Sequence, residues 1–342
     1  MSRPDRTGTI CSPPAVASGE PTPDEPMRPD RAAIAPVPPA ARLRGLRKVY
    51  RRTVALDSVD LDVPTGAVLG LLGRNGSGKT TMLRLLLGLS RPTDGTVELL
   101  GEPMPAGACR ALTHVGALVE GPGFLPFLSG RDNLARFAAA EPLVRTSAIG
   151  ETVNYALHRV GLDREAAIDR PYRGHSLGLK QRLGLAAALL TPRRLVILDE
   201  PTNGLDPAGI RDVRRLIGEL HAAGSTVLLS SHLLSEVEET CTHVAMLSAG
   251  TVVATGTLTE LLEADGPALE ISTTAPNAAL AALRHCRIPG YVERGLVIAD
   301  LVETPPELVL STLASAGVPV SEARRRRTGL EELFLRLTEE GT

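Results

Sequence analysis

Residues 176–182 read SLGLKQR, and this short stretch lies between two other motifs. A glycine-rich loop, GRNGSGKTT, precedes it at 73–81, and an apolar run ending in two acids, LVILDEPTNGLDP, follows it at 195–207. A glycine-rich phosphate loop and an acidic strand end occur together in several classes of nucleotide-binding protein. A serine that opens a helix shortly before the acidic strand favours one arrangement among them.

The loop at 73–81 follows Ala67–Leu72, a short apolar run typical of a strand buried on both faces. Its glycines let backbone N–H groups converge on phosphate oxygens, and a helix from Lys79 to about Leu89 adds its positive N-terminal end. We expect Lys79 to reach the β- and γ-phosphates and Thr80 to hold Mg²⁺. A ligand-free strand-to-helix turn is the alternative. The candidate nucleotide-binding residues of this loop are Gly73, Arg74, Asn75, Gly76, Ser77, Gly78, Lys79, Thr80 and Thr81.

Two carboxylates stand at the tip of a second buried strand, because four apolar residues lead into Asp199 and Glu200. Burying a carboxylate without a partner is costly, so a purely structural role for both is disfavoured. Asp199 suits Mg²⁺ held through water, and Glu200 suits orienting and deprotonating an attacking water. A turn or capping role for Glu200 is the alternative. His232 follows the next buried strand, 226–229, in the sequence Ser-Ser-His.

In this order the motifs resemble ATP-binding-cassette (ABC) ATPases over about residues 42–264. The resemblance implies an α/β P-loop NTPase fold with an antiparallel β subdomain and an inserted helical subdomain at about 121–190. It implies ATP and Mg²⁺ as cofactors, and a contact between His232 and the γ-phosphate. It also places the aromatic ring of Tyr50 against adenine; a surface or core tyrosine is the alternative.

Ser176 is expected to cap a helix that runs from Gly178 to Leu190. The family resemblance implies that this helix end covers the γ-phosphate held by a second copy of the ATPase in a head-to-tail dimer, with Ser176 and Gly178 in contact. It further places Asp206 in the loop through which the two copies sense each other. The usual family motif is LSGGQ, and this chain has Leu177 in place of its first glycine.

Glu120 stands where ABC ATPases usually have glutamine. The surrounding sequence GALVEGPGFLPFLSGRDNL, with SLGLKQRLGLAAALL, is similar to the branch of the family associated with bacitracin and lantibiotic resistance and other drug export. In that branch an acidic residue at this place is familiar. Glu120 is therefore a candidate for contact with Mg²⁺ or its water, and a solvated glutamate is the alternative.

The ends of the chain differ from its centre in composition. Residues 1–40 contain ten of the 27 prolines, which predicts a disordered tail, taken as residues 1–41, with order beginning near Leu43. Beyond residue 264 no phosphate motif occurs, and apolar patches alternate with helix-like segments, so we expect a small α+β appendage at 265–342. Its four-arginine run, Arg324–Arg327, is expected to be a solvated face or a surface attracted to anionic lipid.

No apolar stretch approaches the roughly 18 residues of a membrane span, and residues 1–20 lack an apolar signal core. Four scattered cysteines fit a reduced, cytoplasmic compartment. A net charge of −2 gives no reason to expect nucleic acid as a partner. These observations and the resemblance predict the ATPase subunit of an ABC exporter on the inner face of the membrane, with separate transmembrane permease subunits. A soluble ABC protein acting on ribosomes or nucleic acid and a phosphoryl-transferring kinase are the competing classes.

Overall fold

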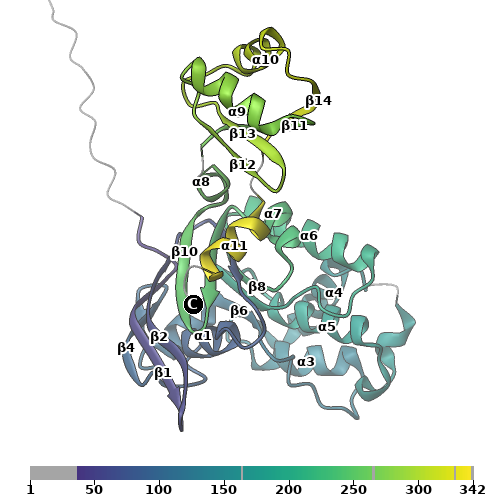
Figure 1. Ribbon diagram of the computed structural model, residues 1–342. Helices are drawn as coiled ribbons and strands as arrows, with labels where there is room; N and C mark the ends of the chain where they lie inside the picture. The colour runs from purple at the N-terminus through teal and green to yellow at the C-terminus, as the bar shows by residue number, and fades with distance from the viewer. Residues whose placement is uncertain (1–36, 163–164, 264–265, 327–328, 340–342) are drawn as a thin grey trace, which may run out of the picture. The chain divides into compact units, whose positions relative to one another are not determined.

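The computed structural model describes residues 37–162, 165–263, 266–326 and 329–339 (Figure 1). The account below concerns residues 38–342, which form one compact unit. The tail expected at 1–41 falls outside the described residues as far as residue 36. Its last two residues differ from the expectation, because Ala40 and Ala41 are each 1% exposed. The Ala40 N–H donates to the Val63 carbonyl at 2.8 Å, so regular pairing begins before Leu43.

A six-stranded sheet forms the centre of this unit, in the order β10-β9-β3-β8-β7-β6. Five of its strands are parallel, and β10 joins β9 antiparallel at one edge, an addition to the parallel core that the sequence predicted. The apolar runs predicted as buried strands are β3, β7 and β8. The strands are β3 (Val68–Leu72), β6 (Val115–Leu118), β7 (Leu195–Asp199), β8 (Thr226–Ser231), β9 (His243–Ser248) and β10 (Thr251–Thr257).

The expected antiparallel subdomain is a second sheet, in the order β2-β1-β4-β5. Its strands are β1 (Ala41–Tyr50), β2 (Thr53–Val63), β4 (Asp94–Leu99) and β5 (Glu102–Pro103). Helix α1 (Lys79–Leu86) contributes Met82 and Leu86 to the apolar cluster that joins this sheet to one face of the central sheet. The helix that carries the phosphate loop is therefore held between two sheets.

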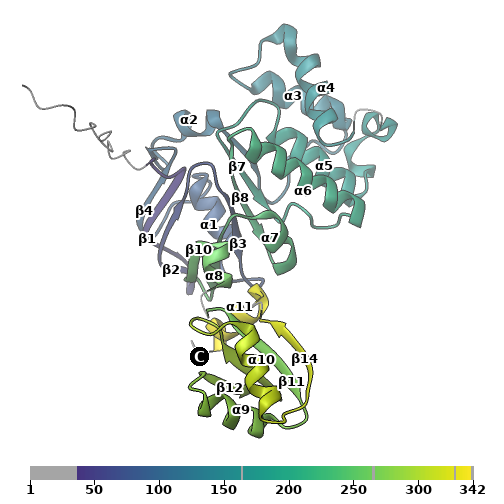
Figure 2. The same ribbon diagram turned by 90° about the horizontal axis from the view of Figure 1, so that it is seen from above.

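Helices cover the other face of the central sheet (Figure 2), where they share one large apolar cluster with β3, β7 and β8. The expected helical region at 121–190 contains α3, α4 and α5, with short 3₁₀ turns at Thr146–Ala148, Ala166–Asp169 and Tyr172–Gly174. Another 3₁₀ turn, Leu112–His114, lies before this region. The helices before residue 264 are α1, α2 (Ala108–Ala111), α3 (Gly130–Ala140), α4 (Ile149–Arg159), α5 (Leu177–Ala188), α6 (Pro207–Ala222), α7 (Leu234–Thr240) and α8 (Leu258–Leu262).

The residues after 266 form a third sheet, in the order β12-β13-β11-β14, with its own apolar cluster under α9 and α10. Its elements are β11 (Ala268–Thr273), α9 (Pro276–His285), β12 (Gly290–Glu293), β13 (Leu296–Asp300), α10 (Pro306–Ser315) and β14 (Val320–Arg325). The α+β composition expected of this region is present. The last helix, α11 (Leu330–Glu339), instead contributes Leu330 and Leu333 to the cluster of the central sheet. Its packing favours assigning α11 to the unit built on the central sheet, although we expected all of 265–342 to be the appendage.

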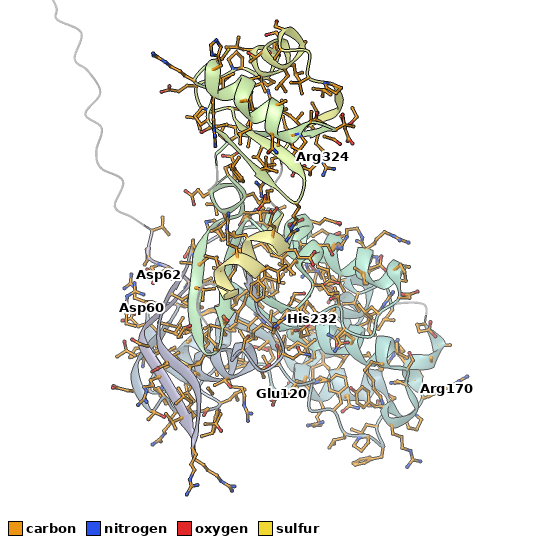
Figure 3. All side chains as sticks on the ribbon, in the orientation of Figure 1. Asp60, Asp62, Glu120, Arg170, His232 and Arg324 are labelled. Atoms are coloured by element: carbon orange, nitrogen blue, oxygen red, sulfur yellow. The ribbon has the colours of Figure 1, made fainter. Side chains whose placement is uncertain are left out.

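The arginine run that begins in β14 and continues past its end is only partly a solvated face. Arg324 (Figure 3) lies with Nε 2.7 Å from Glu270 Oε2. The Arg326 side chain is 6% exposed and contacts Glu293 and Glu332. Two of the three described arginines are thus neutralised within the chain, which weakens the case for lipid attraction.

Candidate nucleotide site

The loop at 73–81 leaves β3 and enters α1 as the sequence predicted. Gly76 and Gly78 have φ angles of 84° and 111°, in the left-handed region that favours glycine. A Cβ at Gly78 would lie 2.6 Å from the Ala55 carbonyl oxygen, so only glycine fits. Ser77 is 6% exposed, and its hydroxyl has no hydrogen-bond partner among the described residues. A buried hydroxyl without a partner is the condition expected of a loop shaped to receive a polar ligand.

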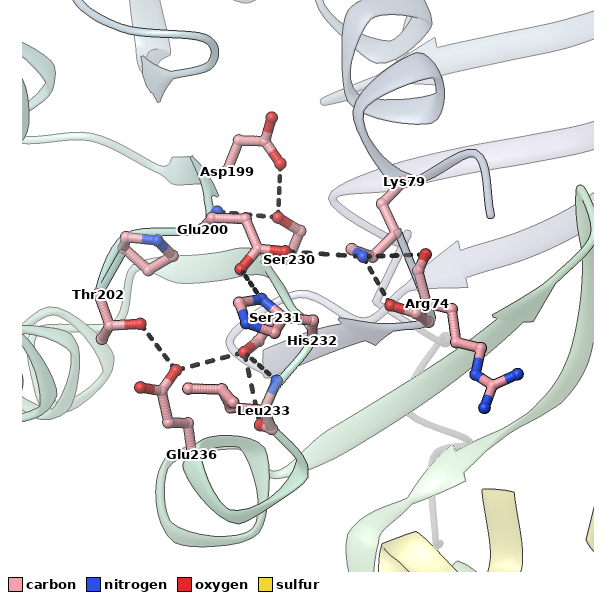
Figure 4. A network of polar contacts seen from close by, with 12 residues as sticks. Arg74, Lys79, Asp199, Glu200, Thr202, Ser230, Ser231, His232, Leu233 and Glu236 are labelled. Atoms are coloured by element: carbon pink, nitrogen blue, oxygen red, sulfur yellow. Dashed lines mark hydrogen bonds and ion pairs between the residues drawn. The ribbon is translucent and has the colours of Figure 1, made fainter. Parts of the chain in front are cut away.

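Lys79 is buried at the first position of α1 and points back over the loop (Figure 4). Its ammonium donates to the Gly73 carbonyl at 2.6 Å and lies 3.6 Å from Oε1 of Glu200. A cation buried this deeply is retained only when it is paired. The lysine therefore lies between the loop and the acidic strand end, where phosphate oxygens would be neutralised.

Asp199 accepts two hydrogen bonds at the end of β7. The Thr80 hydroxyl donates to its Oδ2 at 2.9 Å, and the Ser230 hydroxyl of β8 donates to its Oδ1 at 2.6 Å. Carboxylate and hydroxyl oxygens are the donors that Mg²⁺ prefers. Thr80 and Asp199 thus form an oxygen pair that could hold Mg²⁺, and their role as its ligands stays a prediction.

Glu200 and His232 face each other at the ends of neighbouring strands, with His232 Nδ1 2.7 Å from Oε2 of Glu200. The Glu200 backbone has a φ of 47°, which is unusual for a residue other than glycine and marks a strained turn. Its N–H donates to Ser230 Oγ at 2.9 Å, and Gln181 Nε2 donates to its carbonyl at 3.2 Å. Ser230 and Gln181 thus hold the backbone of Glu200 at its N–H and at its carbonyl, which helps to orient the Glu200 side chain towards His232.

Sequence reasoning missed the residues that brace this pair. Gln181 lies within the quoted SLGLKQR motif, but its contact with the Glu200 turn depends on how α5 packs on β7. Glu236 of α7 is 7% exposed and accepts from the Thr202 hydroxyl at 2.7 Å and the Ser231 hydroxyl at 3.2 Å. The one sequence signal was a glutamate four residues after His232, which a helix brings back to its own N-terminus.

Glu120 and Tyr50, two other predicted nucleotide-site residues, form contacts outside this network. Glu120 is an exposed residue at a φ of 56°, and its Oε1 lies 3.4 Å from Nη1 of Arg84. Among the described residues, no group of three or more acidic, histidine or cysteine side chains is arranged to hold a metal ion. Tyr50 is 41% exposed, with the Lys48 ammonium 4.7 Å from its ring centroid. Its exposed ring leaves an apolar surface for stacking.

The SLGLKQR motif occupies a different place from the phosphate loop. Ser176 caps α5 as predicted, its Oγ accepting from the Leu179 N–H at 3.2 Å, and Asp206 caps α6 by accepting from the Gly209 N–H at 2.9 Å. Ser176, Gly178 and Asp206 line a hollow of about 470 Å³ in which Leu177 is also present. No residue of the loop at 73–81 lines that hollow, so the structure does not bring the two motifs together within one chain.

Comparison with known proteins agrees with this geometry. A family model described as ABC transporter matches residues 56–203. The bacitracin transport ATP-binding protein BcrA of Bacillus licheniformis is 36% identical over 301 residues, which cover 87% of this chain and 96% of that protein. The chain belongs to the family of ABC transporter ATP-binding proteins.

Two further similarities extend the comparison of this ABC ATPase. BcrA of Enterococcus faecalis is 41% identical over 63% of the chain and 68% of its own length. A solved ATP-binding subunit of an ABC transporter is 27% identical, with a TM-score of 0.60 over 66% of this chain and 93% of its own. The P-loop fold and the ATPase activity predicted from the motifs are thereby confirmed. None of the helices in the described part of this ABC ATPase is long and apolar enough to span a bilayer.

Proposed function

We propose that this ABC ATPase powers export of an antibiotic, a peptide or another drug-like compound through separate transmembrane permease subunits. Both BcrA proteins are described as bacitracin transport proteins, and the match to the Bacillus licheniformis protein extends over 96% of its length. Similarity that extends well beyond the nucleotide-site motifs supports a shared role in transport. The ATPase would then act on the inner face of the membrane, in contact with its permease.

The contact between Glu200 and His232 is the observation that carries the proposed mechanism. Glu200 would orient and deprotonate the attacking water, and His232 would hold Glu200 and contact the γ-phosphate. Lys79 would neutralise the β- and γ-phosphate oxygens from the other side. Mg²⁺, held by Thr80 and Asp199, would supply charge neutralisation on the phosphates.

The separation of the two motifs supports a head-to-tail dimer. Ser176 and Gly178 line a hollow that no phosphate-loop residue lines, which supports contact between this helix end and a nucleotide held by another copy. A second copy in the opposite orientation would bring them over it, and Asp206 lies beside them to sense the neighbour. ATP would then favour the closed pair, and hydrolysis would remove that preference.

The test is to purify the chain alone and with the permease encoded nearest to it, and to measure ATP hydrolysis in both preparations. We expect stimulation of hydrolysis by the permease and its loss in Lys79→Ala, with retention of the chain on permease-containing vesicles. A chain that hydrolyses ATP but sediments with ribosomes, and ignores the permease, would support the soluble ABC class instead. Phosphate appearing on a second product rather than in solution would support a kinase.

A further inference from the structure

The last helix of the chain, α11, packs on the ATPase unit beside the proposed hydrolysis site. Its residues Leu330 and Leu333 are 0% and 4% exposed, and they share one apolar cluster with Val237 of α7. Burial of apolar side chains is a main source of folding stability, so these two leucines anchor α11 to the unit. The helix is therefore a fixed part of the surface around α7.

The start of α11 is held by a side chain of α7. Oε1 of Glu238 accepts a hydrogen bond from the Leu330 backbone N–H at 2.6 Å. The first N–H groups of a helix have no partner inside the helix, and a carboxylate there also complements the helix dipole. Glu238 thus joins α7 to α11 by a bond that is independent of their apolar contact.

The same short helix holds the turn that carries His232. Glu236 of α7 accepts from the hydroxyls of Ser231 and Thr202, which flank His232 and Glu200 respectively (Figure 4). The Ser231 hydroxyl in turn accepts from the Leu233 N–H at 3.0 Å. The backbone on both sides of His232 is consequently tied to α7. Glu238, which holds α11, lies in the same helix, six residues after His232 in the sequence.

The side chains of α11 also reach the site directly. A cavity of about 200 Å³ is lined by Gly73 and Arg74 of the phosphate loop, by His232 and Leu234, and by three residues of α11, Glu331, Phe334 and Leu335. The helix therefore forms one wall of the space beside His232. Any displacement of α11 would change the packing around that histidine.

We propose that α11 is a positioning element of the ATPase, and that Glu238 is the positioning residue through which α11 sets the place of His232 relative to Glu200. The inference rests on the proposed role of His232. It also gives the C-terminal region a route to the site, because Arg326, at the end of the third sheet, contacts both Glu293 of β12 and Glu332 of α11. The contact between Glu238 and the start of α11 would therefore affect the rate of ATP hydrolysis.

The experiment compares Glu238→Ala, Glu238→Gln and the control Glu239→Ala in the full chain. Glu239 is the next residue of α7, and it pairs with Arg214 of α6 instead of α11. We expect Glu238→Ala to lower kcat between about three- and tenfold with KM for ATP within about twofold, because nucleotide binding depends on other residues. Glu238→Gln retains a carbonyl acceptor and should restore most of the rate, and Glu239→Ala should match the unmodified chain.

Leu333→Ala tests the apolar contact separately, and thermal melting of each variant reports whether it is folded. A lowered kcat in Leu333→Ala at a temperature well below its melting point would support the inference. Unchanged kcat in both Glu238→Ala and Leu333→Ala would overturn it, as would a parallel loss in Glu239→Ala. If His232→Ala hydrolyses ATP normally, the proposed role of His232 fails. If His232→Ala loses activity but Glu238→Ala and Leu333→Ala are normal, the role of α11 fails while the proposed role of His232 stands.

Discussion

His232 Nδ1 lies 2.7 Å from Oε2 of Glu200, although the two residues are 32 positions apart in the sequence. They meet because β7 and β8 are parallel neighbours, with Asp199 opposite Ser230 in register. The carboxyl ends of adjacent parallel strands point to the same edge of a sheet, which is where α/β proteins bind ligands. One edge of the central sheet thus brings together Glu200, His232 and the oxygens of Asp199 and Thr80.

We expect Glu200→Gln to bind MgATP but to lose about 10²- to 10⁴-fold in kcat, because the amide cannot accept the proton of the attacking water. The closed dimer should then accumulate, and size-exclusion chromatography with ATP should show it. Glu219→Gln, a surface change on α6, is the matched control. Normal turnover in Glu200→Gln would show that Glu200 is not the general base.

Glu120→Gln is expected to lower ATP hydrolysis by less than about threefold, because the exposed pair with Arg84 contributes little and the amide carbonyl can still act as a ligand. Hydrolysis should be measured in the isolated ATPase, and export in the assembled transporter. Arg84→Gln, which removes the other partner of the pair, is the control. Intact basal hydrolysis with abolished export would contradict a role for Glu120 as a ligand of Mg²⁺ or water. That result would indicate that Glu120 contacts a basic group of the permease.

Two deletions should separate the proline-rich segment from the first strand pair. Removal of residues 1–36 should leave the melting temperature and the ATPase rate unchanged, because that composition predicts few buried contacts. Removal of residues 1–41 should lower the melting temperature by several degrees, since Ala40 bonds to Val63 and its carbonyl accepts from the Leu100 N–H at 2.8 Å. Equal melting temperatures for the two deletions would contradict the importance of these bonds.

Cys241 should resist alkylation in the folded protein, because burial raises the pKa of its thiol to about 12 and the thiolate is the reactive form. Cys109 and Cys286 are exposed and should react at pH 8.5, as mass spectrometry of the peptides would show. The neutral thiol is favoured by folding, so its contribution to stability is complete below the unfolded pKa of about 8.5 and is lost as pH rises towards 12. Cys241→Ala should therefore flatten the decline of stability above pH 9, and rapid alkylation of Cys241 at pH 8.5 would refute its burial.

Local sequence patterns specify the phosphate loop, the acidic strand end and the cap of α5, because each depends on neighbours within about ten residues. Glycines at fixed spacing permit the turn, apolar runs specify buried strands, and Ser176 caps the helix that starts beside it. These patterns were sufficient to predict an ABC ATPase. They could not show the antiparallel edge strand β10, whose residues carry no strong alternation.

Which distant side chains complete the site depends on how the helices pack against the central sheet. Gln181, Ser230 and Glu236 brace the Glu200 turn and the His232 turn because α5, β8 and α7 pack around the end of β7. The position of α11 beside His232 likewise depends on apolar contacts and a capping bond that span 92 residues, from Glu238 to Leu330. A local pattern specifies a helix and its buried face. Which surface that face covers depends on how the whole chain packs. In this protein, that packing places α11 against the cavity beside His232.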